Sequence, residues 1–129
     1  MAPPSKPFVL PRTGIEVANR CLLAAMTNKQ SHEDGSLSDE EIHWLTMRAK
    51  GGFGSTMTCA AQVHPLGQGF ARQLACSGDE HSAGLARLAR DIKKEKSFAI
   101  AQLHHAGTKS PADLIGTAPL CPSPDSSTG

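Results

Sequence analysis

The chain has 129 residues, of which 39% are hydrophobic and 19% charged, a composition typical of one ordinary globular domain. Its formal net charge of +1 argues against nucleic acid or an acidic membrane as a partner, and no apolar run approaches the roughly 20 residues of a membrane span. The four cysteines form no Cys-x-x-Cys pair and the amino terminus lacks the apolar core of a secretory leader, so we expect a reduced, cytoplasmic protein.

The amino-terminal segment predicts a short hairpin behind a flexible lead-in. Residues 1–7 hold three of the nine prolines and are expected to form a flexible amino terminus. Two short extended runs, Phe8–Leu10 and Ile15–Val17, flank the turn sequence Pro-Arg-Thr-Gly at residues 11–14. A Pro and Gly turn between two such runs is typical of a β-hairpin.

A buried strand and a capped helix come next. Residues 21–26, Cys-Leu-Leu-Ala-Ala-Met, form a continuous apolar run without alternation, which favours a strand covered on both faces, as in a parallel sheet wrapped by helices. Ser38 followed three places later by Glu41 has the form of a capping box. Apolar residues then recur at helical spacing, at Ile42, Leu45 and Ala49. The two glycines 51–52 end this predicted helix.

A second strand, a second helix and a third strand complete the pattern. Residues 53–61 predict a strand, and residues 79–94 predict a helix with acidic side chains at its positive end and lysines at its negative end. Residues 97–107 begin as an apolar strand, acquire an amide and two imidazoles, and break at a glycine. The rest of the chain is rich in proline and is predicted to be a loop.

Strands that alternate with helices predict the α/β class, with right-handed crossovers and a parallel sheet. The order corresponds to an amino-terminal hairpin followed by the first three strands and two helices of a TIM (β/α)8 barrel, a fold that needs about 250 residues to close. We therefore expect residues 8–129 to be the amino-terminal portion of such a barrel, truncated in the loop after the third strand. The open edge of that strand would invite self-association or a complementing chain.

Ligands of parallel α/β folds gather beyond the carboxyl ends of the strands, where this sequence has its polar candidates. Gln102 offers two donor hydrogens and an acceptor, which suit the edge of a heterocycle such as a flavin's pyrimidine ring, or else the backbone of a loop. The Thr27 hydroxyl suits a ring atom or the cap of a turn. His104 and His105 are adjacent in the predicted strand, so they point to opposite faces and do not ligate one metal together.

Other histidines and cysteines give weaker support for other chemistry. A zinc site that recruits His64 or His81 has no supporting spacing, and we predict no metal site. Cys59 or Cys76 could pair in space with a histidine, but neither thiol has the local signature of a nucleophile. Neither a Gly-x-Gly-x-x-Gly motif nor a phosphate loop occurs.

Four segments, taken in their order and spacing, match the motifs of one known family. Gln-Leu-His-His-Ala-Gly at 102–107 is similar to a Gln-Leu-x-His-x-Gly segment, and residues 19–27 are similar to a first strand of the form Asn-Arg-x-x-x-x-Pro-Met-Thr. Residues 58–67 resemble the second strand and its loop, and residues 77–80 resemble the Ser-Asp-Glu that opens the next helix. The family is the Old Yellow Enzyme family of flavin-dependent ene-reductases, and the resemblance covers its amino-terminal third.

The resemblance implies a fold, a cofactor and a set of contacts. Members of the family are eight-stranded barrels that bind FMN, take hydride from NADPH or NADH and pass it to an activated alkene. Carried over by position, the residues along the flavin would be Ala25, Met26, Thr27, Ala60 and Gln102. Of these, Thr27 would lie near the reducible part of the ring, Ala60 at its central ring and Gln102 at its pyrimidine edge.

Several positions depart from the family pattern. Ala25 replaces the usual proline, Cys59 stands where an acid is common, and Thr108 replaces a frequent arginine. Lys29 occupies the place where one branch of the family has a substrate-facing tyrosine, and His105 would be the family's structural histidine. The groups that anchor the substrate, donate the proton and bind the phosphate come later in the family's sequence, so no catalytic residue is assigned to this chain.

Two hypotheses follow. The first is an FMN-binding oxidoreductase of the ene-reductase type that uses NADPH or NADH, of which this chain is the amino-terminal part and lacks turnover by itself. The alternative is a non-catalytic, truncated half-barrel that needs a complementing chain. A small metal-binding domain is the least favoured possibility.

Overall fold

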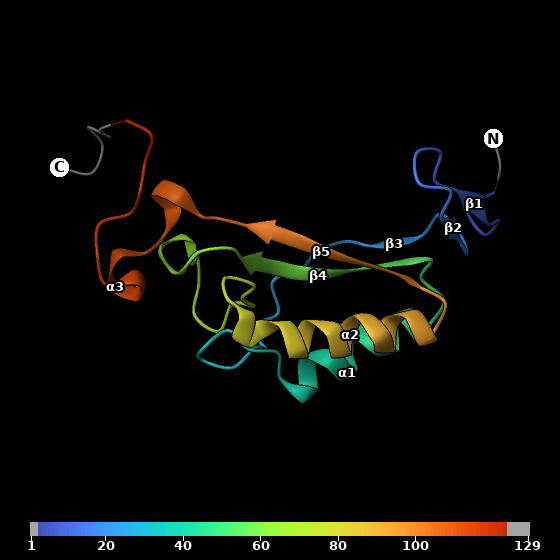
Figure 1. Cartoon of the computed structure of the whole chain (residues 1–129), viewed down its shortest axis with the longest axis horizontal. Helices are drawn as coiled ribbons and strands as arrows, with labels where there is room; N and C mark the ends of the chain where they lie inside the picture. Colours follow the sequence, from blue (N-terminus) through green and yellow to red (C-terminus); the bar gives the residue numbers. More distant parts are fainter. Residues whose placement is uncertain (1–2, 124–129) are drawn as a thin grey trace.

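The structure is a computed structural model that describes residues 3–123. An amino-terminal hairpin precedes a three-stranded parallel sheet, and two long helices lie on one face of that sheet (Figure 1). Seven elements follow the predicted order: β1 (Phe8–Val9), β2 (Glu16–Val17), β3 (Leu22–Leu23), α1 (Asp39–Lys50), β4 (Ser55–Gln62), α2 (Ser82–Lys94) and β5 (Phe98–His104). A short helix that was not predicted, α3 (Ala112–Ile115), comes after them. The predicted partial α/β barrel is thereby confirmed, and residues 3–123 form no closed barrel.

The predicted amino-terminal hairpin is also confirmed. β1 and β2 pair antiparallel, with Phe8 opposite Val17. The Arg20 guanidinium lies over the Phe8 ring, 4.5 Å from its centroid, and this cation–π contact fixes the hairpin to the start of β3. Residues 1–2 lie outside the described part of the chain, and the flexibility of residues 1–7 stays a prediction.

The parallel sheet has the strand order β3-β4-β5, and β3 is shorter than expected. Only Leu22 and Leu23 pair with β4; farther along, Ala75 takes the place beside β4 and forms an isolated parallel bridge with Gln62. The expected burial on both faces is wrong. Leu23 is buried, while the Leu22 side chain is 47% exposed, because the described helices cover only one face of the sheet (Figure 1).

One side chain aligns the starts of β3 and β4. The Asn19 Oδ1 atom accepts the N–H groups of Cys21 and Gly54, each at 2.9 Å, and Asn19 Nδ2 donates to the Gly52 carbonyl at 2.7 Å. Asn19 therefore connects the entry of β3 with the turn between α1 and β4. A Cβ atom at Gly54 would overlap the Asn19 carbonyl oxygen, so the two segments approach at backbone distance.

Helix α1 begins at the predicted cap, whereas α2 begins at Ser82, three residues after the predicted start, and ends at Lys94 as predicted. The Ser38 hydroxyl accepts the Glu41 N–H at 3.0 Å, and α1 ends at Gly51, followed by Gly52 with a φ of +101°. The capping box is not closed, because the Glu41 side chain turns into the protein. A 3-10 turn at Asp79–His81 leads into α2.

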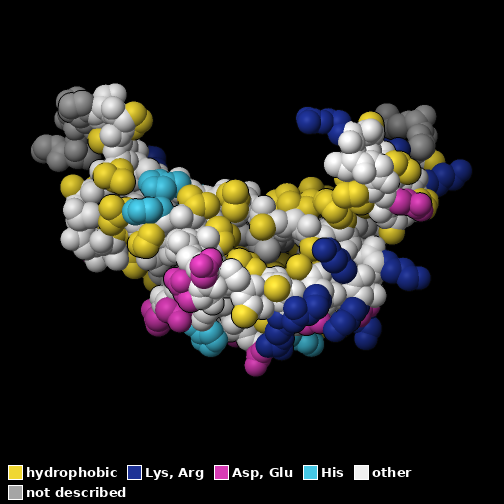
Figure 2. All heavy atoms as spheres, viewed as in Figure 1, with side chains coloured by type: hydrophobic (Ala, Val, Ile, Leu, Met, Phe, Trp, Pro, Cys, Tyr) yellow, Lys and Arg dark blue, Asp and Glu magenta, His cyan; other side chains and the backbone are white. Residues whose placement is uncertain are grey.

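The main hydrophobic core lies between the two helices and the sheet. Its buried residues come from β3, α1 and α2: Leu23, Ile42, Leu45, Ala49, Leu88 and Ile92. Figure 2 shows hydrophobic side chains still in contact with solvent along the hollowed face opposite the helices. On β5 the Leu103 side chain, which pairs with the buried Ala61 and stands on the same face as the helices, is also 68% exposed. Within residues 3–123, the face of the sheet opposite the two long helices thus has no covering layer.

The segment after β5 is not entirely the predicted loop. A 3-10 turn covers Gly107–Lys109, and helix α3 covers four residues. Pro111 supplies a fixed φ at the start of α3, and Gly116 ends the helix with a φ of +73°. The proline and the glycine, which suggested a loop in the sequence, therefore mark the two ends of a short helix. Residues 124–129 of the predicted loop lie outside the described part. Among residues 3–123, no helix is long and apolar enough to cross a bilayer.

Candidate functional site

The carboxyl ends of the parallel strands lie at one edge of the sheet (Figure 1). In this region Ala60 of β4 pairs directly with Gln102 of β5. Paired residues of a parallel sheet stand on the same face, so these two predicted flavin contacts are neighbours. Ala60 is half-buried and Gln102 is exposed. Gln102 alternates along β5 with Ala99 and Ala101, which face α2, so the pair stands on the face opposite the helices.

The other three predicted contacts, Ala25, Met26 and Thr27, follow β3 at the same edge. Ala25 is half-buried, whereas Met26 and Thr27 are exposed. None of the three pairs with β4, because the ladder between β3 and β4 ends at Leu23. The structure therefore places Ala60 in register with Gln102 and leaves residues 25–27 on the adjoining segment.

The donor set at this edge fits the ring of a flavin. Among residues 3–123 no hydrogen bond joins the Gln102 side-chain amide to another residue, so its two donor hydrogens and its acceptor are available to a ligand. The neighbouring Ala60 carries a single methyl group, which leaves room for a flat ring over the strand. An amide beside a small apolar residue suits a planar heterocycle with a polar edge.

A buried carboxylate lies beside this edge. Glu41 is fully buried, and its carboxylate accepts hydrogen bonds from Asn28 Nδ2 at 3.1 Å, from Ser31 Oγ at 2.5 Å and from Cys59 Sγ at 3.0 Å. Glu41 lies in the first turn of α1, where the helix dipole favours a negative charge. Three donors and a helix terminus thus compensate its burial.

Glu41 joins the two segments that carry the predicted contacts. Its donor Asn28 directly follows Thr27, and its donor Cys59 directly precedes Ala60. The capping-box pattern in the sequence predicts only a helix cap for Glu41, and this contact was not predicted. One signal was present in the sequence: Glu41 falls on the same stripe of α1 as the apolar residues that face the core.

The Cys59 thiol is held in its neutral form. Burial raises its pKa, and the hydrogen bond and negative charge of Glu41 raise it further. Neither Cys59 nor Cys76 forms a hydrogen bond with a histidine among residues 3–123. The thiol–histidine pair considered from the sequence is therefore absent from this part of the chain.

The raised pKa of Cys59 predicts a loss of stability in alkali. An unfolded cysteine ionises with a pKa of about 8.5, whereas the folded chain resists ionisation, so stability is unaffected below that pH and falls as the pH rises above it. Between pH 8.5 and pH 9.5 we expect up to about 1 kcal/mol of unfolding free energy to be lost. Urea titrations at the two pH values measure this loss. Cys59→Ala should reduce the loss, leaving the smaller contribution of Cys76, whereas the same loss in wild type and variant would contradict the assignment.

A second buried side chain, Gln73, was also missed. It is fully buried; Nε2 donates to the Ala60 carbonyl at 2.9 Å and lies 3.0 Å from His104 Nδ1, while Oε1 accepts the Gly69 N–H at 2.8 Å. This one amide links β4, the end of β5 and the loop between them. Nothing in the local sequence around Gln73 signals such a role, because all three partners are distant or in a loop.

The adjacent histidines have structural contacts. β5 ends at His104, and His105 lies just beyond it, where its Nδ1 accepts the Gly107 N–H at 3.0 Å. Gly67 packs directly against the His105 ring, leaving no space for a Cβ atom. Within residues 3–123, no three His, Cys, Asp or Glu side chains lie close enough together to hold a metal ion.

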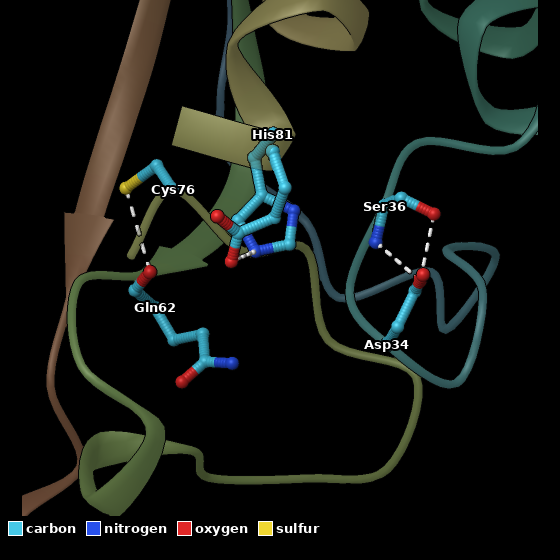
Figure 3. Close-up of polar contacts among 6 residues, drawn as sticks. Asp34, Ser36, Gln62, Cys76 and His81 are labelled. Atoms are coloured by element: carbon cyan, nitrogen blue, oxygen red, sulfur yellow. Dashed lines mark hydrogen bonds and ion pairs between the residues drawn. The ribbon is translucent and has the colours of Figure 1, made fainter. Parts of the chain in front are cut away.

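Figure 3 shows the polar groups near the start of α2, which contact one another. The Asp34 carboxylate accepts the Ser36 N–H at 2.9 Å and the Ser36 hydroxyl at 2.6 Å, and these hydrogen bonds lower its pKa. The Cys76 thiol donates to the Gln62 carbonyl at 3.4 Å, and burial raises its pKa. His81 Nε2 lies 3.4 Å from a carboxylate oxygen of the next residue back along the chain. These contacts stabilise a turn and a helix start.

Fold and site together define a class: a parallel α/β barrel segment with its candidate binding residues at the carboxyl ends of its strands. The family model for the NADH:flavin oxidoreductase / NADH oxidase family matches residues 6–129. The chain belongs to this family, and the resemblance to Old Yellow Enzymes is confirmed. The cofactors of the family are FMN and NADH or NADPH.

Named relatives agree with this assignment. The chain is 35% identical over 118 residues to "Probable NADH-dependent flavin oxidoreductase YqiG" of Bacillus subtilis, covering 89% of this chain and 32% of that protein. It is 34% identical over 110 residues to the NADH oxidase of Thermoanaerobacter brockii, covering 84% of this chain and 17% of that protein. The chain thus spans about a third or less of the length of these relatives.

Solved structures give the same fold. A 2-naphthoyl-CoA reductase in complex with 2-naphthoyl-CoA superimposes with a TM-score of 0.82 at 32% identity, covering 88% of this chain and 17% of that chain. The Old Yellow Enzyme homologue of Zymomonas mobilis superimposes with a TM-score of 0.85 at 19% identity, covering 95% of this chain and 33% of that chain. The second likeness concerns the fold alone.

Proposed function

We propose that the chain forms part of the FMN site of an oxidoreductase of the ene-reductase type that uses NADPH or NADH. The observation that carries the proposal is the pairing of Ala60 with Gln102 on the open face, with the Gln102 amide free of protein partners among residues 3–123. Membership of the flavin oxidoreductase family supports the identity of the ring. The activated alkene as substrate is part of the same proposal.

Each of the five residues has a distinct role in this proposal. The Gln102 amide donates to and accepts from the polar edge of the ring, which fixes its orientation. Ala25 and Ala60 are small and let the ring approach the strand ends, and Met26 lies along the ring. The Thr27 hydroxyl donates a hydrogen bond that tunes the ring's potential. When bound, FMN supplies hydride transfer between a nicotinamide and an electrophilic carbon.

A second candidate is a half-barrel without turnover that needs a complementing chain. A groove of about 230 Å³ runs between α2 and β5. Its walls are apolar and include Leu85, Leu88, Ile92, Ala99 and Ala101. The β5 edge and the exposed Leu103 continue this surface. An added strand and helix would cover both, which would also satisfy the open edge.

An FMN titration tests the first candidate. We expect the purified chain to bind FMN, measured by quenching of flavin fluorescence, without oxidising NADH. Gln102→Leu should weaken binding about tenfold or more, because it removes the hydrogen bonds to the ring edge. Gln68→Leu, which changes an amide that donates to the Phe70 carbonyl at 3.2 Å, is the control and should leave FMN binding within about twofold.

Sedimentation of the same samples separates the two candidates. A chain that sediments as a discrete monomer and binds FMN through Gln102 supports the first. Equal FMN binding by wild type and Gln102→Leu would contradict it. A discrete assembly of several chains that takes up no FMN would favour the half-barrel.

A further inference from the structure

β4 contains a β-bulge at the predicted flavin contacts. Met57 pairs with Ile100, and the next pair of the ladder is Ala60 with Gln102. Three steps along β4 therefore stand opposite two steps along β5. The extra residue lies between Met57 and Ala60, next to the site proposed to bind the ring.

The bulge decides which side chain meets Gln102. In a regular ladder Cys59, two residues after Met57, would pair with Gln102 and stand on the open face, while Ala60 would turn toward the helices. The extra residue reverses this outcome: Cys59 is buried at 2% exposure against Glu41, and Ala60 takes the place beside Gln102. A methyl group thus stands where a regular strand would place a thiol.

Two side chains satisfy the backbone groups that the bulge removes from the ladder. The Thr58 hydroxyl accepts the Gln102 N–H at 3.1 Å and donates to the Cys59 carbonyl at 2.8 Å. The Gln73 amide donates to the Ala60 carbonyl at 2.9 Å. Thr58 and Gln73 are both buried, and they supply partners for backbone groups that the strand ladder leaves unpaired at the bulge.

We propose that Thr58 and Gln73 are positioning residues that hold this bulge and thereby select Ala60, rather than Cys59, as the β4 residue facing the cofactor beside Gln102. The inference rests on the proposed function, because it assigns the bulge a purpose at the FMN site. Gln73 also contacts His104 Nδ1 and the Gly69 N–H, so it anchors the bulge to the end of β5 and to the loop after β4.

The test compares two buried threonines of β4. Thr58→Val removes the hydroxyl that supports the bulge with little change of shape. Thr56→Val is the matched control, because Thr56 is equally buried in the same strand and its hydroxyl bonds to Ser97 Oγ at 2.9 Å, away from the bulge. Three quantities are measured: hydrogen exchange of the Gln102 amide, alkylation of Cys59 by N-ethylmaleimide, and FMN affinity. Exchange of the Leu45 amide reports global opening.

In Thr58→Val we expect the Gln102 amide to exchange about tenfold faster relative to Leu45, the change that follows from losing one hydrogen bond. Cys59 alkylation should accelerate by a similar factor, because a relaxed ladder turns the thiol to the open face, and FMN binding should weaken. Thr56→Val should leave the Gln102 to Leu45 exchange ratio and Cys59 alkylation within about twofold of wild type. Equal effects of the two variants, or no effect of Thr58→Val, would overturn the inference.

Three further variants keep the test decisive if Thr58→Val does not fold. Thr58→Ser retains the hydroxyl and should behave as wild type, whereas Thr58→Ala should show the fast exchange and alkylation; identical behaviour of Ser and Ala would refute the role of the hydroxyl. Gln73→Leu should reproduce the alkylation of Cys59. If wild type binds no FMN, the proposed function fails for this chain, while exchange and alkylation still decide whether Thr58 and Gln73 hold the bulge.

Discussion

Replacing Glu41 with alanine is expected to lower the free energy of unfolding by about 3–5 kcal/mol, a large part of the roughly 5–15 kcal/mol of a typical domain. The carboxylate accepts hydrogen bonds from Asn28, Ser31 and Cys59 in a fully buried position. Its removal leaves these donors without a partner and away from water, and each unpaired donor costs about 1–3 kcal/mol. The cost of the three is not additive, because the loop that carries Asn28 and Ser31 can partly reopen to solvent.

Conservative and neighbouring substitutions distinguish this role of Glu41 from helix propensity. Glu41→Gln keeps the shape but replaces one acceptor oxygen with a donor group that faces other donors. We therefore expect it to recover less than half of the unfolding free energy that Glu41→Ala loses. Glu40→Ala changes the preceding, exposed residue of α1 and should alter the unfolding free energy by no more than about 0.5 kcal/mol. Urea unfolding followed by circular dichroism measures all three, and a Glu41→Ala chain as stable as Glu40→Ala would refute the buried network.

The sequence allowed the elements that rest on local chemistry to be predicted. The Ser38 cap, the glycines after α1 and the apolar spacing of both helices are signals within a few residues of one another, and the structure has these elements at the expected places. The strand predicted over residues 21–26 is longer than β3, because an apolar run does not reveal how many of its residues pair with the neighbouring strand. The ladder between β3 and β4 ends at Leu23, although the predicted strand continues to residue 26. The place beside Gln62 is taken by Ala75, more than fifty residues later in the chain.

For the candidate site, residue types were visible in the sequence but their geometry was not. Gln102 could be singled out because an amide ends an apolar strand, whereas Ala60 entered through the family resemblance alone. Their pairing depends on a bulge in a run, Thr-Cys-Ala-Ala, that contains no glycine or proline to signal it. Glu41 and Gln73 act on residues distant in sequence, and such contacts are fixed by tertiary packing rather than by local pattern.

Replacing Gly54 with alanine is the second change with a large expected effect, a loss of about 3 kcal/mol or more. A Cβ atom at this position would overlap the Asn19 carbonyl oxygen and lie 2.7 Å from Asn19 Oδ1 and 2.8 Å from Asn19 N. Asn19 cannot move away cheaply, because its side chain is fixed by hydrogen bonds to Gly52, Cys21 and Gly54 itself. The new methyl group must therefore separate the starts of β3 and β4.

Gly78→Ala is the control that makes the Gly54 result interpretable. A Cβ atom at Gly78 would also overlap its neighbours, but these are the carboxylate atoms of Glu80, the far end of an exposed and flexible side chain. That side chain can rotate into solvent, so we expect a change below about 1 kcal/mol, although the overlap is as severe as at Gly54. Thermal and urea unfolding of both variants measure the difference. Equal destabilisation of the two variants would mean that the overlap alone sets the loss of unfolding free energy. A larger loss in Gly54→Ala means that the loss depends on whether the overlapped neighbour is backbone or a flexible side chain. In that case Asn19 holds β3 and β4 together.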